Sequence, residues 1–283
     1  MKRYTALTCW GDRTSLDVIL AFSTNLPTTG IVDNDDQLVF YFEEEDFSEA
    51  TIDEICSWIP DPSALSFERG AIEEQNWNAE FESSLEPVRV AGDLVFTQSW
   101  NPVEPAHPGD LVVVIDPKMS FGTGHHESTR LIARLMMKLD LAGRRVLDIG
   151  TGTGVLAVIA AKKGAAQIIA IDNNEWAVGN AIENLPLNDV PEDMVDVRLC
   201  EIDTVAEGPF DIILANIHRN VIIELLPAIV RKLPAETEGL LLTSGVLFAD
   251  YESLVDAAAE YGLEPVDEER ENEWIATTWR RKN

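Results

Sequence analysis

The hydrophobic and polar positions follow two different patterns, one in the first seventy residues and another in the rest of the chain. In the first part, short alternating runs and helical spacings predict the order strand, helix, strand, strand, helix, strand. The two middle strands are predicted to turn at Asn34, Asp35 and Asp36. This βαββαβ order predicts a small α+β domain of ferredoxin-like type.

The second predicted helix begins after Ser48, because a serine followed by a carboxylate about three residues later resembles a capping box. Ile52, Ile55 and Ile59 then share one face of that helix. No clustered nucleophile and base occurs in this part of the chain, which favours a domain that recognises a substrate.

The rest of the chain alternates between apolar runs of strand length and helical spacings, which predicts a doubly wound, mostly parallel sheet of Rossmann-like type. The last two strand patterns, 263–272 and 273–281, have no helix between them, so the sheet is expected to end in an antiparallel hairpin. The preceding strands are predicted at 111–115, 144–150, 167–172, 195–200, 210–217 and 239–246.

We therefore expect a substrate-recognition domain at 1–70, a linker region at 71–100 and a larger α/β domain at 101–283. Trp77, Phe81 and Trp100 lie among acidic residues in the linker region. Such aromatic residues are typical of a connector that docks on one domain, and a hinge that positions the first domain is the alternative.

A glycine-rich turn follows the strand at 144–150, and Gly152-x-Gly154-x-x-Ala157 fits a loose dinucleotide-binding pattern. Asp148 just before it would face an ammonium group or a water bound to it, and Asp172, which ends the next strand, is placed to bind ribose hydroxyls. A dinucleotide enzyme would continue the sheet where this chain has a hairpin. These features favour S-adenosylmethionine as the ligand; glycines that only permit close helix packing are the alternative.

Several segments resemble the ribosomal protein L-eleven methyltransferase family, which has a class I methyltransferase fold. The segment 146–165, "VLDIGTGTGVLAVIAAKKGA", is similar to the first methyltransferase motif, and 170–188 is similar to the second. The segment 210–220, "FDIILANIHRN", resembles the motif after the fourth strand of amine methyltransferases. A loop characteristic of the family is similar to 120–131, "SFGTGHHESTRL".

The resemblance implies trimethylation of amino groups, on lysine side chains and the N-terminal amine, of a large-subunit ribosomal protein. It also implies cofactor contacts by Thr129, Gly150, Asp172 and Asn216, to which the glycine turn adds Asp148, Gly152 and Gly154. The chain departs from many relatives at His125 and Glu127, where they have Thr and Pro, and at 218–220, where they have a proline.

Asn216 is the candidate catalytic residue, because its amide oxygen can accept a hydrogen bond from a neutral amine and direct the lone pair at the methyl group. A carboxylate at that place would hold the proton on the amine, and a strand-end cap is the structural alternative. His125 and His126 are interpreted as part of a loop that covers the cofactor, where either imidazole could relay a proton.

Acidic residues outnumber basic ones by 50 to 21, for a net charge of −29. Such a surface repels nucleic acid, so no direct nucleic-acid binding is expected. The charge either steers in a basic protein substrate or adapts the surface to high salt, where screening weakens self-repulsion. The run 43–46, "EEED", is typical of a solvated turn, with contact to a basic substrate as the alternative.

No apolar run approaches the roughly 20 residues that span a membrane, and no signal-peptide pattern is present. Cys9, Cys56 and Cys200 are too scattered for a disulfide framework, and adjacent histidines do not form a metal-ligand set. We therefore expect a cytoplasmic monomer without a bound metal or membrane contact. A methyltransferase for another protein or a small-molecule amine, an NAD-dependent oxidoreductase and a non-catalytic adaptor remain alternatives.

Overall fold

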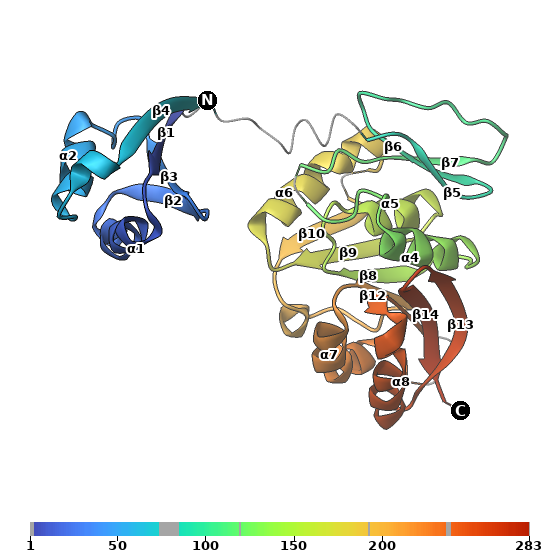
Figure 1. The fold of residues 1–283 in the computed structure, drawn as a ribbon. Coiled ribbons are helices and arrows are strands. Elements are labelled where there is room, and N and C mark those ends of the chain that lie inside the picture. Colours follow the sequence, from blue (N-terminus) through green and yellow to red (C-terminus); the bar gives the residue numbers. More distant parts are fainter. Residues whose placement is uncertain (1–2, 74–84, 119, 192, 236–238, 283) are drawn as a thin grey trace. The chain divides into compact units, whose positions relative to one another are not determined.

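The computed structural model describes residues 3–73, 85–118, 120–191, 193–235 and 239–282. The chain divides into two compact units at residues 77 and 78, and each unit is described by itself (Figure 1). Trp77 and Phe81, two aromatic residues of the predicted linker, lie outside the described residues. No helix in the described part of the chain is long and apolar enough to cross a membrane.

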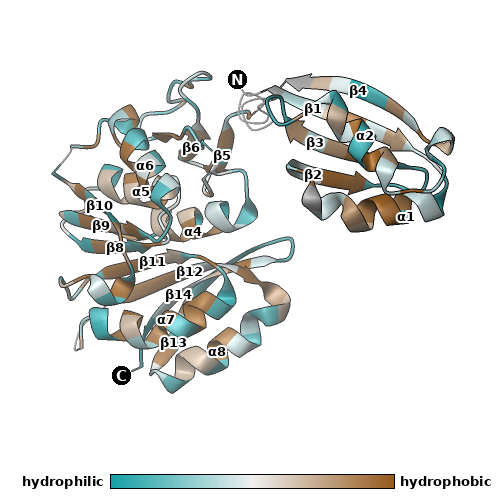
Figure 2. Ribbon diagram, turned by 90° about the vertical axis from the view of Figure 1, so that its left-hand side faces the viewer, coloured by the Kyte–Doolittle hydropathy of each residue, from teal (hydrophilic) through white to brown (hydrophobic). Residues whose placement is uncertain are grey.

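The first unit is an antiparallel sheet with the order β2-β3-β1-β4. Alternate side chains of β3 are buried, and they pack with β1 against both helices, which lie on the same side of the sheet (Figure 2). The βαββαβ order confirms the predicted ferredoxin-like arrangement. Its elements are β1 (Arg3–Trp10), α1 (Arg13–Phe22), β2 (Thr28–Asp33), β3 (Gln37–Glu43), α2 (Glu49–Ser57) and β4 (Ser66–Glu73).

The start of α2 differs from the predicted capping box in one respect. The residue three positions after Ser48 is Thr51, and its hydroxyl accepts a long hydrogen bond of 3.5 Å from the Ser48 backbone N–H. The predicted carboxylate partner is therefore wrong, because a threonine hydroxyl at this position also reaches back to the free N–H group at the start of a helix.

The second unit contains a seven-stranded sheet with the order β10-β9-β8-β11-β12-β14-β13. Its first five strands are parallel, and β14 runs antiparallel to both neighbours, which confirms the predicted closing hairpin. The strands are β8 (Arg145–Ile149), β9 (Gln167–Asp172), β10 (Val195–Leu199), β11 (Ile212–Asn216), β12 (Leu240–Leu247), β13 (Leu263–Glu271) and β14 (Trp274–Arg281).

Helices cover both faces of this sheet, which explains why its parallel strands are apolar on both sides. Residues of α4 and α5 pack in the core on one face, and residues of α7 and α8 pack on the other (Figure 1). The chain reverses its direction of winding between β8 and β11, where ligands bind in open α/β sheets. The helices are α4 (Glu127–Met137), α5 (Val155–Lys162), α6 (Glu175–Asn184), α7 (Arg219–Lys232) and α8 (Tyr251–Glu260).

A separate three-stranded sheet precedes the large one in the sequence. It consists of β5 (Val88–Ala91), β6 (Leu94–Thr97) and β7 (Leu111–Val114), with β6 and β7 parallel. The strand predicted at 111–115 therefore belongs to this small sheet and not to the large one. Two strands of the small sheet fall within the region predicted as a linker, and they contribute to the core formed with α4 and α5.

Two buried asparagines hold the segment that leads from β7 toward the glycine turn. Asn188 accepts a hydrogen bond from the Val114 N–H at 2.8 Å and donates to the Val114 carbonyl at 2.7 Å. Asn184, on α6, accepts from the Asp116 N–H at 2.9 Å and donates to the Thr153 carbonyl at 2.9 Å. One helix end thus satisfies backbone groups of both the incoming segment and the turn.

We expect Asn184→Ala to destabilise the second unit by about 2–3 kcal/mol, because it leaves buried backbone groups without hydrogen-bond partners. Urea unfolding followed by circular dichroism measures the change. The matched control on the same helix is Glu183→Ala, which removes only an exposed ion pair with Lys118 and should change stability by less than about 1 kcal/mol. Equal stability of the two variants would show that the asparagine hydrogen bonds contribute nothing.

Candidate active site

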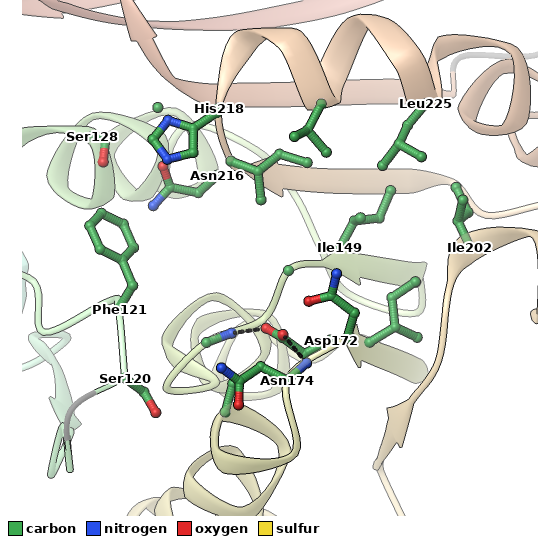
Figure 3. A pocket seen from close by; sticks show the side chains of 18 of the residues that line it. Ser120, Phe121, Ser128, Ile149, Asp172, Asn174, Ile202, Asn216, His218 and Leu225 are labelled. Atoms are coloured by element: carbon green, nitrogen blue, oxygen red, sulfur yellow. Dashed lines mark hydrogen bonds between the residues drawn. The ribbon is translucent and has the colours of Figure 1, made fainter. Parts of the chain in front are cut away.

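A cavity of about 640 Å³ opens at the carboxyl ends of the central parallel strands (Figure 3). Such a volume suits a small-molecule ligand. Its walls come from the loop 120–128, the glycine turn, the residues that follow β9, β10 and β11, and the start of α7. Of the predicted site residues, Gly150, Gly152, Asp172 and Asn216 line the cavity, whereas Thr129, Asp148 and Gly154 do not.

The glycines of the turn are required by the packing of the protein itself. Gly152 has a φ of 55°, and a Cβ on it would lie 2.3 Å from the carbonyl oxygen of Phe121. A Cβ on Gly150 would lie 2.5 Å from the side chain of Ile217. Gly154 begins α5 in a left-handed conformation, and a Cβ there would come within 3.1 Å of Ala181 on α6. Close approach of three segments therefore accounts for the glycine pattern, and it leaves Gly150 and Gly152 on the cavity wall.

Asp172 stands at the end of β9 with both carboxylate oxygens fixed by backbone donors. The N–H of Gly152 donates to one oxygen at 3.0 Å, and the N–H of Asn174 donates to the other at 2.9 Å (Figure 3). Each carboxylate oxygen has about two acceptor sites, so capacity remains for hydroxyl donors from a ligand in the cavity. This geometry agrees with the ribose-binding role predicted for Asp172.

Asp148 lies beneath the turn, fully buried, and not on the cavity surface. Burial and, to a smaller extent, the nearby Asp172 raise the pKa of its carboxyl to about 7, against the opposing effect of the hydrogen bond from Thr151 at 2.7 Å. Its second oxygen has no hydrogen-bond partner. Asp148 therefore contacts the turn through Thr151 and has no surface on the cavity, so its predicted contact with an ammonium group stays a prediction.

Asn216 ends β11 and lines the cavity. Its Nδ2 donates to the Oγ1 of Thr129 at 3.2 Å, which fixes the orientation of the amide, and its Oδ1 has no hydrogen-bond partner. Thr129 is itself fully buried. The structure therefore brings these two predicted residues together, with Thr129 behind Asn216 and Asn216 facing the cavity.

The two adjacent histidines have different surroundings. His126 lines the cavity, and its Nδ1 accepts a hydrogen bond from the Ser128 backbone N–H at 3.1 Å. His125 does not line the cavity, and its Nε2 lies 2.8 Å from the Glu86 carbonyl oxygen. Within the described ranges, no group of three or more His, Cys, Asp or Glu side chains could hold a metal ion.

Sequence reasoning missed several residues of the cavity wall, among them Phe121, Glu201, Ile202 and Trp274. Glu201 and Ile202 follow β10, and the rule that ligands bind at the ends of parallel strands could have identified them. Trp274 comes from the closing hairpin, and no local pattern places that segment beside the loop 120–128.

The residues present fit S-adenosylmethionine in three respects. Asp172 retains acceptor sites for ribose hydroxyls, Gly150 and Gly152 line the cavity, and Asn216 adds an uncharged polar side chain to its wall. Asp172, Gly150, Gly152 and Asn216 are thus the residues that would hold the cofactor.

The raised pKa of Asp148 predicts a specific pH dependence of stability. Between about pH 4 and 7 the unfolded state loses this proton while the folded state keeps it, so stability falls as pH rises through that window. Asp148→Asn should lack this component, and its stability relative to wild type should rise by about 3 kcal/mol between pH 5 and pH 8. Urea unfolding at both pH values measures this difference; Asp256→Asn, on an exposed position of α8, should keep the wild-type slope. An Asp148→Asn slope equal to wild type would contradict the buried-carboxyl assignment.

Comparisons with known proteins agree with this geometry. A family model described as ribosomal protein L11 methyltransferase (PrmA) matches residues 14–282. A protein of that name from Chlorobaculum tepidum is 39% identical over 258 residues, which cover 89% of this chain and 88% of the relative. Another, from Bacteroides fragilis, is 31% identical over 265 residues and covers 92% of each chain.

A solved structure is also similar. The crystal structure of ribosomal protein L11 methylase from Lactobacillus delbrueckii subsp. bulgaricus aligns with a TM-score of 0.64 and 26% identity, and covers 70% of this chain and all of that chain. The match of the family model along nearly the whole chain, together with the cavity at the glycine turn, shows the family. The chain belongs to the ribosomal protein L11 methyltransferase family and is a class I, S-adenosylmethionine-dependent methyltransferase.

Proposed function

We propose that this protein transfers methyl groups from S-adenosylmethionine to amino groups of a large-subunit ribosomal protein. The acceptors are lysine side chains and the N-terminal amine. The observation that carries the proposal is the position of Asn216 on the cavity wall, where Thr129 holds its amide nitrogen and its Oδ1 has no hydrogen-bond partner. The names of the relatives, ribosomal protein L11 methyltransferase, support the class of substrate.

The first task of the site is to accept a neutral amine. A free lysine amine has a pKa near 10.4, so its neutral form costs about 4–5 kcal/mol at pH 7. A partly desolvated cavity reduces that cost, because it disfavours the ammonium form. When bound, S-adenosylmethionine supplies a methyl group that is already activated by its positively charged sulfur.

The second task is alignment, and Asn216 performs it. Its Oδ1 accepts a hydrogen bond from an amine N–H, which directs the nitrogen lone pair away from the amide and toward the reacting carbon. The amide remains uncharged, so it does not hold an extra proton on the amine as a carboxylate would. Most of the rate enhancement then comes from positioning.

We assign substrate recognition to the first unit, within the proposed boundaries 1–70, 71–100 and 101–283. A small-molecule amine would need no separate recognition module, so a protein substrate accounts better for this unit. The net charge of −29 would favour approach of a basic protein. We place the reaction in the cytoplasm and propose that the enzyme acts as a monomer without direct nucleic-acid contact.

The proposal predicts labelling of one ribosomal protein. Incubation with methyl-labelled S-adenosylmethionine and large-subunit proteins from a strain lacking this enzyme should label amino groups of that protein, located by mass spectrometry. Asn216→Ala should slow transfer by about 100-fold or more, because the amine loses its alignment. Asn216→Asp should be similarly slow, because its carboxylate favours the protonated amine.

The matched control is Asn220→Ala, four residues further along and exposed on α7, which should transfer at the wild-type rate. Cofactor binding without any labelled ribosomal protein would refute the substrate assignment. Wild-type rates in Asn216→Ala would refute the assigned role of the amide.

A further inference from the structure

The loop 120–128 forms part of the cavity wall, and its two halves are held by different groups. Four of its residues line the cavity: Ser120, Phe121, His126 and Ser128. The first half is fixed at the glycine turn, where the Thr153 N–H donates a hydrogen bond to the Phe121 carbonyl at 2.9 Å. The second half leads into α4, and its attachment comes from the closing hairpin.

Arg130, in the first turn of α4, connects this second half of the loop to the hairpin. Its Nη1 donates a hydrogen bond to the backbone carbonyl of His125. Its Nε donates to Oε1 of Glu271, on β13, at 3.1 Å, and its Nη2 donates to the same oxygen. One guanidinium group therefore joins a carbonyl of the loop to a carboxylate that lies 141 residues further along the chain.

This bridge requires the shape of an arginine side chain. A guanidinium group carries five N–H donors in a rigid plane, so one edge can face a carboxylate while another N–H reaches a carbonyl group. A lysine carries all its donors on a single nitrogen atom, and it cannot hold two partners in the same way. The residue type at position 130 therefore determines whether the loop and the hairpin are joined.

The ion pair within the bridge is largely shielded from water. The side chain of Arg130 is 15% exposed and that of Glu271 is 25% exposed. The hydrogen bond from Arg130 lowers the pKa of the Glu271 carboxyl below its usual value, against the opposing effect of burial. The carboxyl is therefore ionised at neutral pH. Because a partly buried pair is screened less by salt than an exposed one, the bridge should also persist at high ionic strength.

A second arginine holds the Glu271 carboxylate in place. Its Oε2 lies 2.7 Å from Nη2 of Arg134, which is one turn further along α4. The Nε of Arg134 donates a hydrogen bond to the Val90 carbonyl, on β5, at 3.0 Å. The carboxylate that orients Arg130 is thus fixed by a group that is itself attached to the small sheet.

Two further contacts join the start of α4 to the tip of the hairpin. The Glu127 carboxylate accepts a hydrogen bond from Nδ2 of Asn272 at 3.0 Å. The ring centroids of His126 and Trp274 lie 4.7 Å apart at an interplanar angle of 72°, and both residues line the cavity. The tip of the hairpin therefore lies against the part of the loop that faces the cavity.

We propose that Arg130, oriented by Glu271, is a positioning residue for the cofactor cavity, because it fixes the His125 carbonyl and so holds the loop 120–128 in the conformation that forms the cavity wall. Neither side chain of the ion pair is among the described residues that line the cavity, so the pair acts on cofactor binding through the loop. This role is independent of the identity of the methylated substrate.

The expected effect on affinity follows from the population of loop conformations. A ligand that binds only the cavity-forming conformation binds more weakly in proportion to the share of molecules that hold it. If loss of the bridge reduces that share to about one tenth, the apparent affinity falls about tenfold. A residue that merely attached α4 to β13 would change the stability of the fold and leave the affinity of the folded protein unchanged.

Two variants remove the bridge to different extents. Arg130→Met keeps an apolar stem and removes the donors and the charge, whereas Glu271→Gln keeps the size of the side chain and one acceptor oxygen. The matched control is Lys138→Met. Lys138 follows the last residue of α4 and forms ion pairs with the same strand, β13, at 2.9 Å to Asp267 and 2.8 Å to Glu269. It joins the same helix to the same strand at the end distant from the loop.

The first experiment measures binding of S-adenosylhomocysteine to the full-length proteins by calorimetry. The Kd should rise about 5- to 20-fold in Arg130→Met and about threefold in Glu271→Gln, and Lys138→Met should bind as wild type does. Wild-type affinity in a folded Arg130→Met would overturn the proposal, and so would an equal loss of affinity in Lys138→Met. If circular dichroism shows that Arg130→Met is unfolded, wild-type affinity in Glu271→Gln overturns it instead.

The second experiment observes the loop itself, by hydrogen exchange and mass spectrometry without ligand. Backbone amides of 120–126 should exchange at least about fivefold faster in Arg130→Met than in wild type, because the loop opens more often. Lys138→Met should keep the wild-type rate in this segment. Equal rates in all three proteins would overturn the proposal. Both experiments remain decisive if no ribosomal protein proves to be a substrate, because neither needs a methylated product.

Discussion

The close approach of the loop 120–128 to the glycine turn is the contact on which the site depends. Gly152 and the Phe121 carbonyl are so close that no Cβ fits between them, and the Thr153 N–H completes the junction by donating to the same carbonyl. The turn positions Asp172 through a backbone N–H, and the loop leads into α4, which carries Thr129 behind Asn216. One tight backbone junction therefore connects both ends of the cavity.

The large features of the fold could be predicted from the sequence because they depend on local periodicity. Continuous apolar runs identified the parallel strands, and the absence of a helix between the strand patterns 263–272 and 273–281 identified the antiparallel ending. The segment 111–115 was correctly predicted as a strand, but it was assigned to the wrong sheet, because strand pairing depends on contacts between residues distant in sequence. The capping partner of Ser48 was assigned by a general pattern that also accommodates Thr51.

Site residues at the ends of strands could be predicted from the sequence. Site residues whose position depends on tertiary packing could not. Asp172 and Asn216 end β9 and β11, the two strands on either side of β8 in the parallel sheet, so topology alone brings them to one cavity. Asp148 also ends a strand, yet its side chain turns beneath the glycines, and no pattern of residues reveals which side of a turn a carboxylate takes. The places of Phe121 and Trp274 on the cavity wall could not be predicted, because the two residues are far apart in the sequence and their rings contact His126 only in the folded chain.

The position of β14 between β12 and β13 has a consequence for synthesis of the protein. The ribosome makes chains from the N-terminus, so β13 emerges before β14, the strand that attaches it to the sheet. Until β14 is available, the edge of β12 has no partner on that side and presents free backbone N–H and C=O groups, a template for pairing with other chains. The last strand thus closes an aggregation-prone edge, and the same strand brings Trp274 to the cavity, so protection of the sheet and completion of the site occur together.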